Sequence, residues 1–249
     1  MTASILCALA SLSFILISKG YCAEIVGGTP SIPHSRPYMV FLKSNCGGTL
    51  IKPNWVLTAA HCFTVNQEVL LGAHSIKYPE KEKQIFSVKK CVKYPHYKKG
   101  KYEHDIMLIQ LHGNATLTAA VDILSLPETA KDIPPNTKCL VAGWGKTAYN
   151  GTVSDDLREV NVTIIDWSVC KDSYEKVRKK VTKNMICAGD KKGNKDACKG
   201  DSGGPLICNN SFTGIVAFGE GCGAAKYPGV YTHLTNEYLN WIKKVIQSY

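Results

Sequence analysis

Residues 196–205 read Asp196-Ala-Cys-Lys-Gly-Asp-Ser-Gly-Gly-Pro205, a glycine-rich run around one serine. A serine hydroxyl is a weak nucleophile until an imidazole can take its proton, and the imidazole needs a carboxylate to orient it. The stretches Leu57-Thr-Ala-Ala-His61-Cys62 and Asp105-Ile-Met-Leu-Ile-Gln-Leu111 contain both groups. Each stretch alone has an ordinary structural explanation, such as a packed core histidine or a glycine turn. Together they predict catalysis by a serine nucleophile, with the candidate residues His61, Asp105 and Ser202.

The composition is that of a globular chain. Its 249 residues are 45% hydrophobic and 20% charged, which allows one large domain or two small ones and excludes a disordered or collagenous chain. Gly, Pro, Asn and Asp separate short apolar runs about every ten residues, a spacing typical of an all-β barrel or sandwich. The segment after Thr235 differs, because its apolar residues share one helical face, and it predicts a C-terminal amphipathic helix. Those residues are Tyr238, Leu239, Ile242, Val245 and Ile246.

The first residues predict a secreted protein. The run Ile5–Ser18 has 14 residues without a charge, too short to span a bilayer, and small residues follow it. We interpret residues 1–22 as a cleaved signal peptide; a buried N-terminal helix is the alternative, because no Lys or Arg precedes Ile5. We therefore expect a product of the secretory pathway, secreted or stored in a granule, without a membrane anchor.

Eleven cysteines in such a compartment predict disulfides. Nine remain when Cys7 and Cys22 leave with the signal peptide, so four bridges can form and one cysteine stays free, capped or joined to a second chain. A zinc site is the alternative, but no Cys-x-x-Cys occurs and the adjacent pair His61-Cys62 suits one ion poorly. We expect no metal and no cofactor.

Four Asn-x-Ser/Thr sequons are candidate glycosylation sites. Within 160–164 apolar and polar residues alternate, which predicts a strand with one buried face and with the second residue facing solvent. The sequons begin at Asn114, Asn150, Asn161 and Asn209.

Three motifs carry a family resemblance. Ile25-Val-Gly-Gly28, Ala-Ala-His61-Cys62 and Gly-Asp-Ser202-Gly-Gly-Pro resemble the trypsin-like serine proteases, and the resemblance runs from Ile25 to the C-terminal helix. Residues 33–39, 71–76 and 156–160 are similar to the granzyme A and K group, tryptase-type proteases of cytolytic granules. The resemblance implies an all-β protein of two antiparallel six-stranded β-barrels with a C-terminal α-helix. We expect the serine protease domain over 25–249, its halves at about 25–125 and 126–249, and the catalytic residues in the cleft between them.

The resemblance also assigns roles to the catalytic residues. Ser202 attacks, His61 acts as general base and then acid, and Asp105 orients His61. The N–H groups of Gly200 and Ser202 form the oxyanion hole, at roughly 3 to 4 kcal/mol per donor. Ala217 stands where the family usually has a serine whose hydroxyl solvates the triad aspartate, so we expect a slower enzyme.

The implied disulfides use eight of the nine cysteines and leave Cys91 unpaired. The pairs are Cys46–Cys62, Cys139–Cys208, Cys170–Cys187 and Cys198–Cys222.

Substrate specificity follows from Asp196, six residues before the nucleophile, which resembles the carboxylate at the base of the trypsin pocket. The resemblance makes Gly219 and Gly229 the pocket walls and predicts cleavage after Arg or Lys. Ala197 lacks a hydroxyl that would bind a compact ammonium, whereas Arg can still bind the carboxylate with two hydrogen bonds, so Arg should be preferred. The alternative is one solvated charge in a lysine-rich loop.

Activation is expected to require a new N-terminus at Ile25, whose ammonium in the family pairs with the residue here numbered Asp201. The preceding residues 23–24, Ala-Glu, then form an activation dipeptide, and a bond after Glu24 is not one that trypsin cuts. A digestive or plasma trypsin is therefore the weaker alternative.

The net charge of +10 predicts anionic partners. We expect acidic glycans or proteoglycans to bind, and no specific nucleic acid, since no reading motif accompanies the charge. Solvated lysines are the alternative, as is a silent protease homologue that acts only by binding. Cys91 could link a homodimer, or remain a capped or buried thiol in a monomer. The basic residues form two clusters: Lys89, Lys90, Lys93, Lys98, Lys99 and Lys101, and Lys176, Arg178, Lys179, Lys180 and Lys183.

Overall fold

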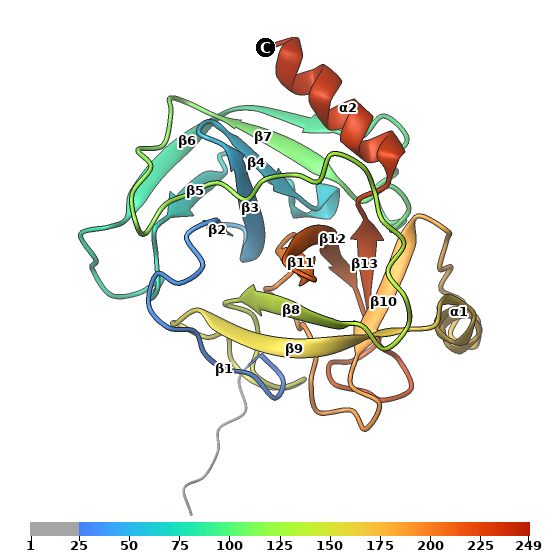
Figure 1. The fold of residues 1–249 in the computed structure, drawn as a ribbon. Helices are drawn as coiled ribbons and strands as arrows, with labels where there is room; N and C mark the ends of the chain where they lie inside the picture. Colours follow the sequence, from blue (N-terminus) through green and yellow to red (C-terminus); the bar gives the residue numbers. More distant parts are fainter. Residues whose placement is uncertain (1–24) are drawn as a thin grey trace, which may run out of the picture.

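A computed structural model describes residues 25–249, so the predicted signal peptide, the activation dipeptide, Cys7 and Cys22 lie outside the described residues. The described chain forms two antiparallel β-barrels (Figure 1). The first barrel has the strand order β2-β3-β4-β7-β6-β5 and closes where Val40 of β2 pairs with Leu71 of β5. Its strands are β2 (Met39–Leu42), β3 (Cys46–Lys52), β4 (Trp55–Thr58), β5 (Glu68–Leu71), β6 (Gln84–Lys93) and β7 (Met107–Leu111).

The second barrel is closed by β8, which pairs with both β9 and β11. The short strand β1 (Thr29–Pro30) pairs with β9 and lies outside this ring. Six strands form the ring: β8 (Lys138–Gly143), β9 (Arg158–Ile165), β10 (Met185–Gly189), β11 (Pro205–Cys208), β12 (Ser211–Phe218) and β13 (Gly229–His233). The two closed six-stranded antiparallel barrels implied by the family resemblance are confirmed.

The predicted C-terminal helix is α2 (Asn236–Gln247), and it begins where the side chain of Thr235 accepts a hydrogen bond from the N–H of Tyr238. A second helix, α1 (Trp167–Glu175), was not predicted from the sequence. Asp166 caps it by accepting from the N–H groups of the first turn. Only Cys170 and Tyr174 of α1 are buried, so its sequence carries no apolar stripe.

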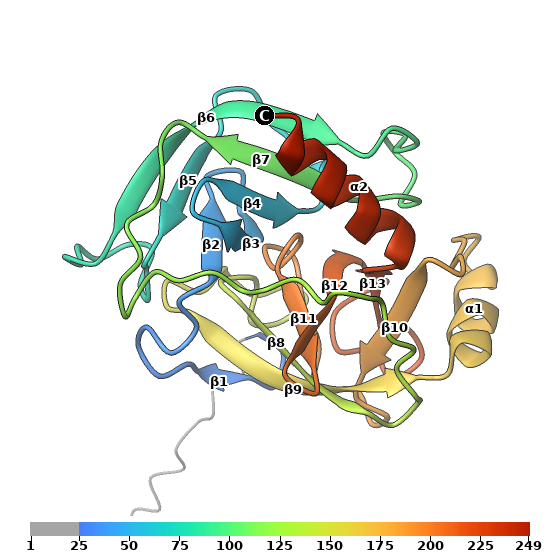
Figure 2. The ribbon, with the colours of Figure 1, turned by 45° about the horizontal axis from the view of Figure 1, so that its top comes forward.

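The two ends of the domain cross to the opposite barrel. Ile25 is fully buried in the core of the second barrel, although all six strands of the first barrel follow it in sequence. Tyr238 and Ile242 of α2 pack into the core of the first barrel. In Figures 1 and 2, α2 accordingly lies beside β7. Each barrel is therefore held by a segment from the other half of the chain, which fixes how the two pack together.

Strand β9 has the predicted alternation, with Val160, Val162 and Ile164 buried and Asn161 exposed. The asparagines of the other three sequons are exposed as well, so each could be reached by a glycan. Among residues 25–249 no helix is long and apolar enough to span a bilayer.

Four disulfides join the described cysteines, in the pairs that the resemblance implies: Cys46–Cys62, Cys139–Cys208, Cys170–Cys187 and Cys198–Cys222. Cys91 is the free cysteine of the described residues, and it is half-buried.

Candidate active site

His61 lies in a short 3-10 turn (Ala60–Cys62) that follows β4. Its backbone N–H donates to Asp105 Oδ1 at 2.9 Å, and its ring atom Nδ1 lies 2.6 Å from Asp105 Oδ2. Asp105 precedes β7 and is fully buried, whereas the His61 side chain is 29% exposed. Because a carboxylate only accepts hydrogen bonds, this contact places the proton on Nδ1 and leaves Nε2 with a free lone pair.

Ser202 lies in the loop between β10 and β11, and it lines the same cavity as His61. The cavity has a volume of about 230 Å³ and is open to solvent. The carbonyl of Ser202 accepts a 2.7 Å hydrogen bond from the N–H of Gly47 in the first barrel. The nucleophile candidate from the second barrel and the base candidate from the first thus meet at one opening.

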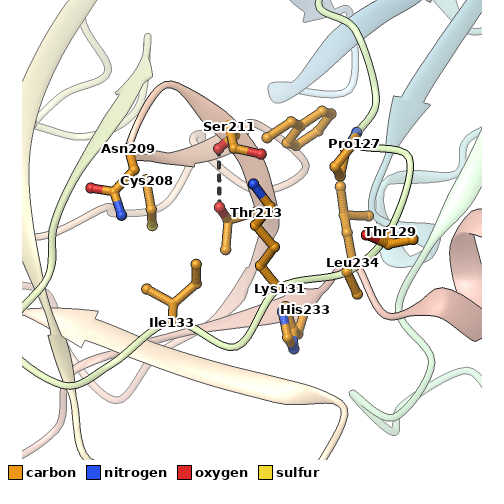
Figure 3. Close-up of a pocket in the computed structure, with 12 residues that line it drawn as sticks. Pro127, Thr129, Lys131, Ile133, Cys208, Asn209, Ser211, Thr213, His233 and Leu234 are labelled. Carbon is orange, nitrogen blue, oxygen red and sulfur yellow. Dashed lines mark hydrogen bonds between the residues drawn. The ribbon is translucent and has the colours of Figure 1, made fainter.

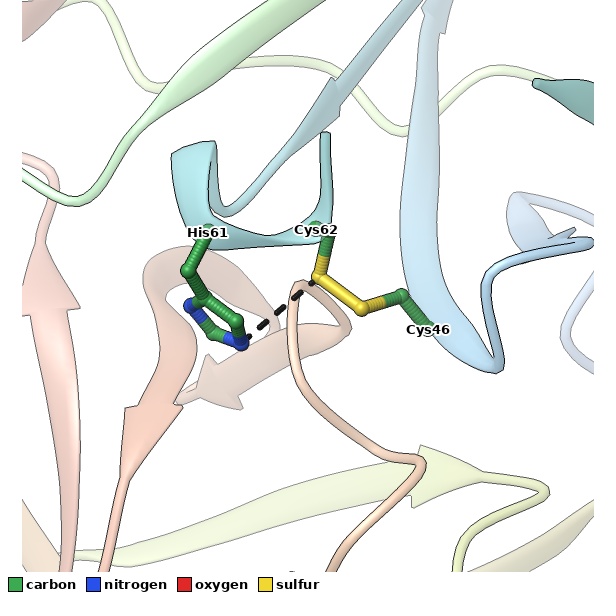
Figure 4. A group of neighbouring side chains, drawn as sticks. All are labelled: Cys46, His61 and Cys62. Atoms are coloured by element: carbon green, nitrogen blue, oxygen red, sulfur yellow. Dashed lines mark hydrogen bonds between the residues drawn. A yellow bond between two sulfur atoms is a disulfide. The ribbon is translucent and has the colours of Figure 1, made fainter. Parts of the chain in front are cut away.

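The disulfide Cys46–Cys62 packs against both His61 and Ser202. Cys62 follows His61 directly and is bonded to Cys46; its sulfur lies 3.8 Å from His61 Nε2 (Figure 4) and 3.5 Å from the Ser202 carbonyl oxygen. Cys46, His61 and Cys62 are close enough together to resemble a metal site. Both sulfurs are in the disulfide, however, so neither is a thiolate that could bind zinc.

Asp196 is buried, with only 2% of its surface exposed. Its Oδ2 accepts from the N–H of Gly223 at 3.0 Å, whereas Oδ1 has no hydrogen-bond partner in the described part of the chain. Burial raises the pKa of Asp196 to about 7. The unpaired oxygen of this buried carboxylate can accept from a further donor, and a cationic side chain is a donor of the required charge.

The space in front of Asp196 depends on glycine. A Cβ on Gly229 would lie 2.8 Å from Asp196 Oδ1 and 3.2 Å from the hydroxyl of Tyr231. Ala197, Gly219 and Gly229 all line the cavity that contains His61 and Ser202. The structure therefore places three of the four predicted pocket residues at the cavity of the predicted nucleophile and base. Asp196 does not line this cavity itself; it lies against Gly229, which does.

Asp201, beside the nucleophile, is completely buried. Its Oδ1 accepts from the N–H of Gly145 at 2.8 Å and its Oδ2 from the N–H of Cys198 at 2.8 Å. Burial raises its pKa to about 6. Residues 1–24 precede Ile25 in this sequence, so the nitrogen of Ile25 is a peptide nitrogen and supplies no cation.

Two residues of the site were not predicted from the sequence. Gly143 and Gly145 form the wall against Asp201: a Cβ on Gly145 would lie 2.5 Å from the carboxyl carbon, and one on Gly143 would lie 2.1 Å from Oδ1. The signal was present as the run Gly143-Trp-Gly145 at the end of β8. Gly200, the other predicted oxyanion-hole residue beside Ser202, has a φ of +106° and packs against Gly145. It does not line the cavity that contains His61 and Ser202.

A further cavity of about 110 Å³ lies between the segment 127–133 and the strands β12 and β13 (Figure 3). Lys131 and His233 line it together with apolar side chains, and burial lowers the pKa of His233. It contains none of the predicted catalytic or pocket residues, so it takes no part in the candidate active site.

Comparison with known proteins agrees with this geometry. The family model described as trypsin matches residues 25–242. The chain is similar to granzyme A of Bos taurus, with 50% identity over 230 residues, covering 90% of this chain and 89% of the relative. It is also 41% identical to cationic trypsin-3 of Rattus norvegicus and 41% identical to serine protease 1 of Homo sapiens, each covering 90% of both chains. The chain therefore belongs to the trypsin family and is a trypsin-like serine endopeptidase.

Proposed function

We propose that this endopeptidase cleaves peptide bonds after Arg, and less readily after Lys, with Ser202 as nucleophile, His61 as base and Asp105 as its orienting carboxylate. The 2.6 Å contact between His61 Nδ1 and Asp105 Oδ2, at a cavity shared with Ser202, is the observation that carries the proposal. It fixes the imidazole tautomer that can accept a proton.

The first half of the reaction acylates the serine. Ser202 Oγ bonds to the carbonyl carbon of the substrate while its proton passes to His61 Nε2, and the carbonyl π electrons move to the oxygen. The N–H groups of Gly200 and Ser202 are proposed to stabilise that oxyanion. When the carbonyl re-forms, the C–N bond breaks and His61 gives its proton to the departing amine.

Deacylation repeats these steps with water in place of the amine. His61 takes a proton from the water while its oxygen bonds to the acyl carbon, and the Ser202 ester bond then breaks as the proton returns to Oγ. Asp105 keeps its charge throughout and stabilises the imidazolium that forms in each half.

The preference for Arg follows from Asp196 and Ala197. Asp196 Oδ1 is buried without a hydrogen-bond partner in the part of the chain that the structure describes, and a guanidinium can bind both carboxylate oxygens at once. Ala197 offers no hydroxyl to a lysine ammonium, which has to give up more hydration on entering the pocket.

The test compares amide substrates that differ only in having Arg, Lys or Phe before the cleaved bond, using protein that begins at Ile25. We expect Arg to be turned over faster than Lys, and Phe least. Ser202→Ala is the control and should remove the activity. Equal turnover of Lys and Arg would contradict the refinement, and a preference for Phe would contradict the pocket.

The protein is proposed to be made as a zymogen. Release of the Ile25 amino group would supply a cation for Asp201, which is buried and has only neutral donors in the described residues. A buried carboxylate without a counter-charge is costly, so the freed ammonium would favour a reorganised loop around Ser202. Protein beginning at Ala23 should be inert, whereas protein beginning at Ile25 should be active; equal activity would contradict this mechanism.

Storage in cytolytic granules or secretion, with acidic glycans as partners, is proposed from the similarity to the granule proteases and from the charge. Removing residues 1–24 takes away Lys19 and Glu24, so the net charge stays +10. The two basic clusters are neighbours, because Lys180 of one pairs at 2.7 Å with Glu103, which lies close in sequence to Lys101 of the other. Retention on heparin should fall steeply with salt, and elution near physiological salt would contradict a role in storage.

Two states of assembly are open for this chain: a monomer, and a homodimer linked by a disulfide through Cys91. Cys91 lies within β6, paired with Ile109 of β7. Burial raises the pKa of its thiol, which lowers its reactivity, so the structure favours the monomer. Non-reducing electrophoresis decides between them: a band at twice the monomer mass that disappears in Cys91→Ser supports the dimer.

A further inference from the structure

Strand β12 has a free edge where it borders the cavity. Up to Ile215 it lies between β11 and β13. Val216 then forms hydrogen bonds with the backbone of Gly203 and Gly204, and among residues 25–249 Phe218 pairs with β13 only. Beyond Val216 the residues Ala217, Phe218 and Gly219 line the cavity that contains Ser202. A free strand edge is a surface on which an extended peptide can add as another strand.

The side chain of Lys179 already forms a hydrogen bond with a backbone carbonyl at this edge. Lys179 Nζ donates a 3.0 Å hydrogen bond to the carbonyl oxygen of Gly219, the first residue after β12. The same ammonium forms a 2.8 Å ion pair with Glu220 and lies 5.8 Å from the ring centre of Phe218. The Lys179 side chain is only 28% exposed, so it does not extend freely into solvent like the lysines around it.

The position of Lys179 is fixed by the turn that follows α1 and by the buried residue Tyr174. Arg178 has a φ of +58°, a left-handed turn, and the N–H of Lys179 donates to the carbonyl of Tyr174 at 3.1 Å. Tyr174 is fully buried, and its hydroxyl donates to the carbonyl of Pro228 at 2.7 Å. Tyr174 thus braces the end of α1 against the segment that leads into β13, which holds the Lys179 ammonium beside Gly219.

We propose that Lys179 is a specificity-determining residue that shields the free edge of β12 at Gly219. A peptide extended on the amino side of the cleaved bond must displace the Lys179 ammonium before its backbone can pair with Gly219. A substrate whose first residue is the Arg before the cleaved bond does not reach Gly219. The chain thus discriminates against substrates that are extended on that side. This inference rests on the proposed function, because it assigns an additional substrate contact to the same site.

The adjacent residue Lys180 provides a matched control. Its ammonium pairs with Glu103 at 2.7 Å, its side chain is 75% exposed, and it has the same charge and length. Lys179→Met and Lys180→Met therefore change the net charge equally, but only the first frees the Gly219 carbonyl.

The experiment uses protein that begins at Ile25 and two amide substrates with one leaving group, a single Arg and a tetrapeptide of three alanines followed by Arg. The measured quantity is the ratio of kcat/KM for the tetrapeptide to kcat/KM for the single residue. We expect Lys179→Met to raise this ratio by about three- to tenfold, mainly through KM, since one hydrogen bond no longer has to be displaced. The ratio for Lys180→Met should equal that of the wild type.

A binding measurement separates this inference from the proposed catalysis. In a Ser202→Ala background, Lys179→Met should tighten the Kd of the tetrapeptide by a similar factor. An unchanged or lower ratio and Kd in Lys179→Met, or the same rise in Lys180→Met, would overturn the role of Lys179. Absence of hydrolysis of both substrates by the wild type would instead contradict the proposed function, while the Kd comparison would still decide the role of Lys179.

Discussion

The N–H of Gly47 in the first barrel donates a 2.7 Å hydrogen bond to the carbonyl of Ser202 in the second barrel. The next residue, Gly203, has a φ of +85°. Gly204, which follows it, also packs closely against the first barrel, because a Cβ on Gly47 would lie 3.1 Å from Gly204 Cα. The position of the nucleophile relative to His61 is thus set by a backbone contact between the barrels that leaves no room for side chains.

Gly203→Ala tests this contact. The new Cβ would lie 2.1 Å from Thr58 Oγ1 and 2.4 Å from the Gly47 carbonyl oxygen, in a conformation that L residues rarely adopt. We expect a loss of more than about 2 kcal/mol in the free energy of unfolding, together with a large loss of activity. Urea unfolding and kcat/KM provide the two measurements.

Gly100→Ala is the control for this substitution. Gly100 has a φ of +82°, close to that of Gly203, but no atom lies within 4 Å of its Cβ position. It should lose only the cost of the backbone conformation, about 1 kcal/mol, and keep its activity. Equal losses in both variants would mean that backbone conformation alone explains the effect at Gly203.

The pKa of Asp201 predicts how pH affects the untrimmed protein. Burial raises its pKa to about 6, so the folded state binds a proton more tightly than the unfolded state does. The stabilisation is full below the unfolded pKa and is lost as the pH rises through about 6. Protein that begins at Ala23 should therefore gain about 2 kcal/mol, relative to its Asp201→Asn variant, between about pH 7 and about pH 4.5.

Trimming should remove this gain. Under the proposed activation, the Ile25 ammonium would favour the charged carboxylate and lower the pKa of Asp201, so protein that begins at Ile25 should not take up a proton in that range. Denaturant unfolding of both forms at the two pH values measures the difference. The same gain in both forms would show that the ammonium does not reach Asp201.

The raised pKa of Asp196 predicts a second pH dependence, in ligand binding. With its pKa raised to about 7, Asp196 takes up a proton as the pH falls below that value, and a cationic aromatic amidine such as benzamidine should bind only the charged carboxylate. We expect the Kd of benzamidine to rise by up to tenfold for each unit of pH below about 7. Asp196→Asn should bind weakly at every pH; a Kd that does not vary with pH in the wild type would show that Asp196 stays charged.

The residues proposed for the site reside in short motifs that the sequence shows directly. His61, Asp105, Ser202 and Asp196 each lie in a run whose residue types state the chemistry, and the barrels follow from turn spacing together with the family resemblance. Helix α1 was missed because only Cys170 and Tyr174 face the core, which leaves no periodic pattern to detect.

The contacts between distant segments could not be predicted in the same way. Ile25 packs in the second barrel and α2 in the first, and neither exchange leaves a local signal in the sequence. Lys179 stands among other basic residues, and in the sequence nothing distinguishes it from a solvated lysine. Its bond to Gly219 depends on a turn at Arg178 and on the brace at Tyr174, both of which are properties of the folded chain.

Ala217→Ser is predicted to increase activity. The oxygens Oδ1 and Oδ2 of Asp105 accept hydrogen bonds from the backbone and the ring of His61. Ala217 is buried, at the position where the family resemblance implies a serine hydroxyl that solvates this carboxylate. A serine there would give the buried carboxylate a further donor and hold His61 more firmly. We expect kcat to rise by about two- to tenfold with KM nearly unchanged, since the residue acts on the orientation of His61.

Ala217→Val separates this effect from packing. Valine fills the same space without a donor, so it should not raise kcat, and it should lower stability if the site has no spare volume. Pre-steady-state acylation rates with an Arg ester show whether the chemical step itself is faster. An unchanged acylation rate in Ala217→Ser would mean that Asp105 is already fully oriented by His61, and that the missing hydroxyl is not what limits this enzyme.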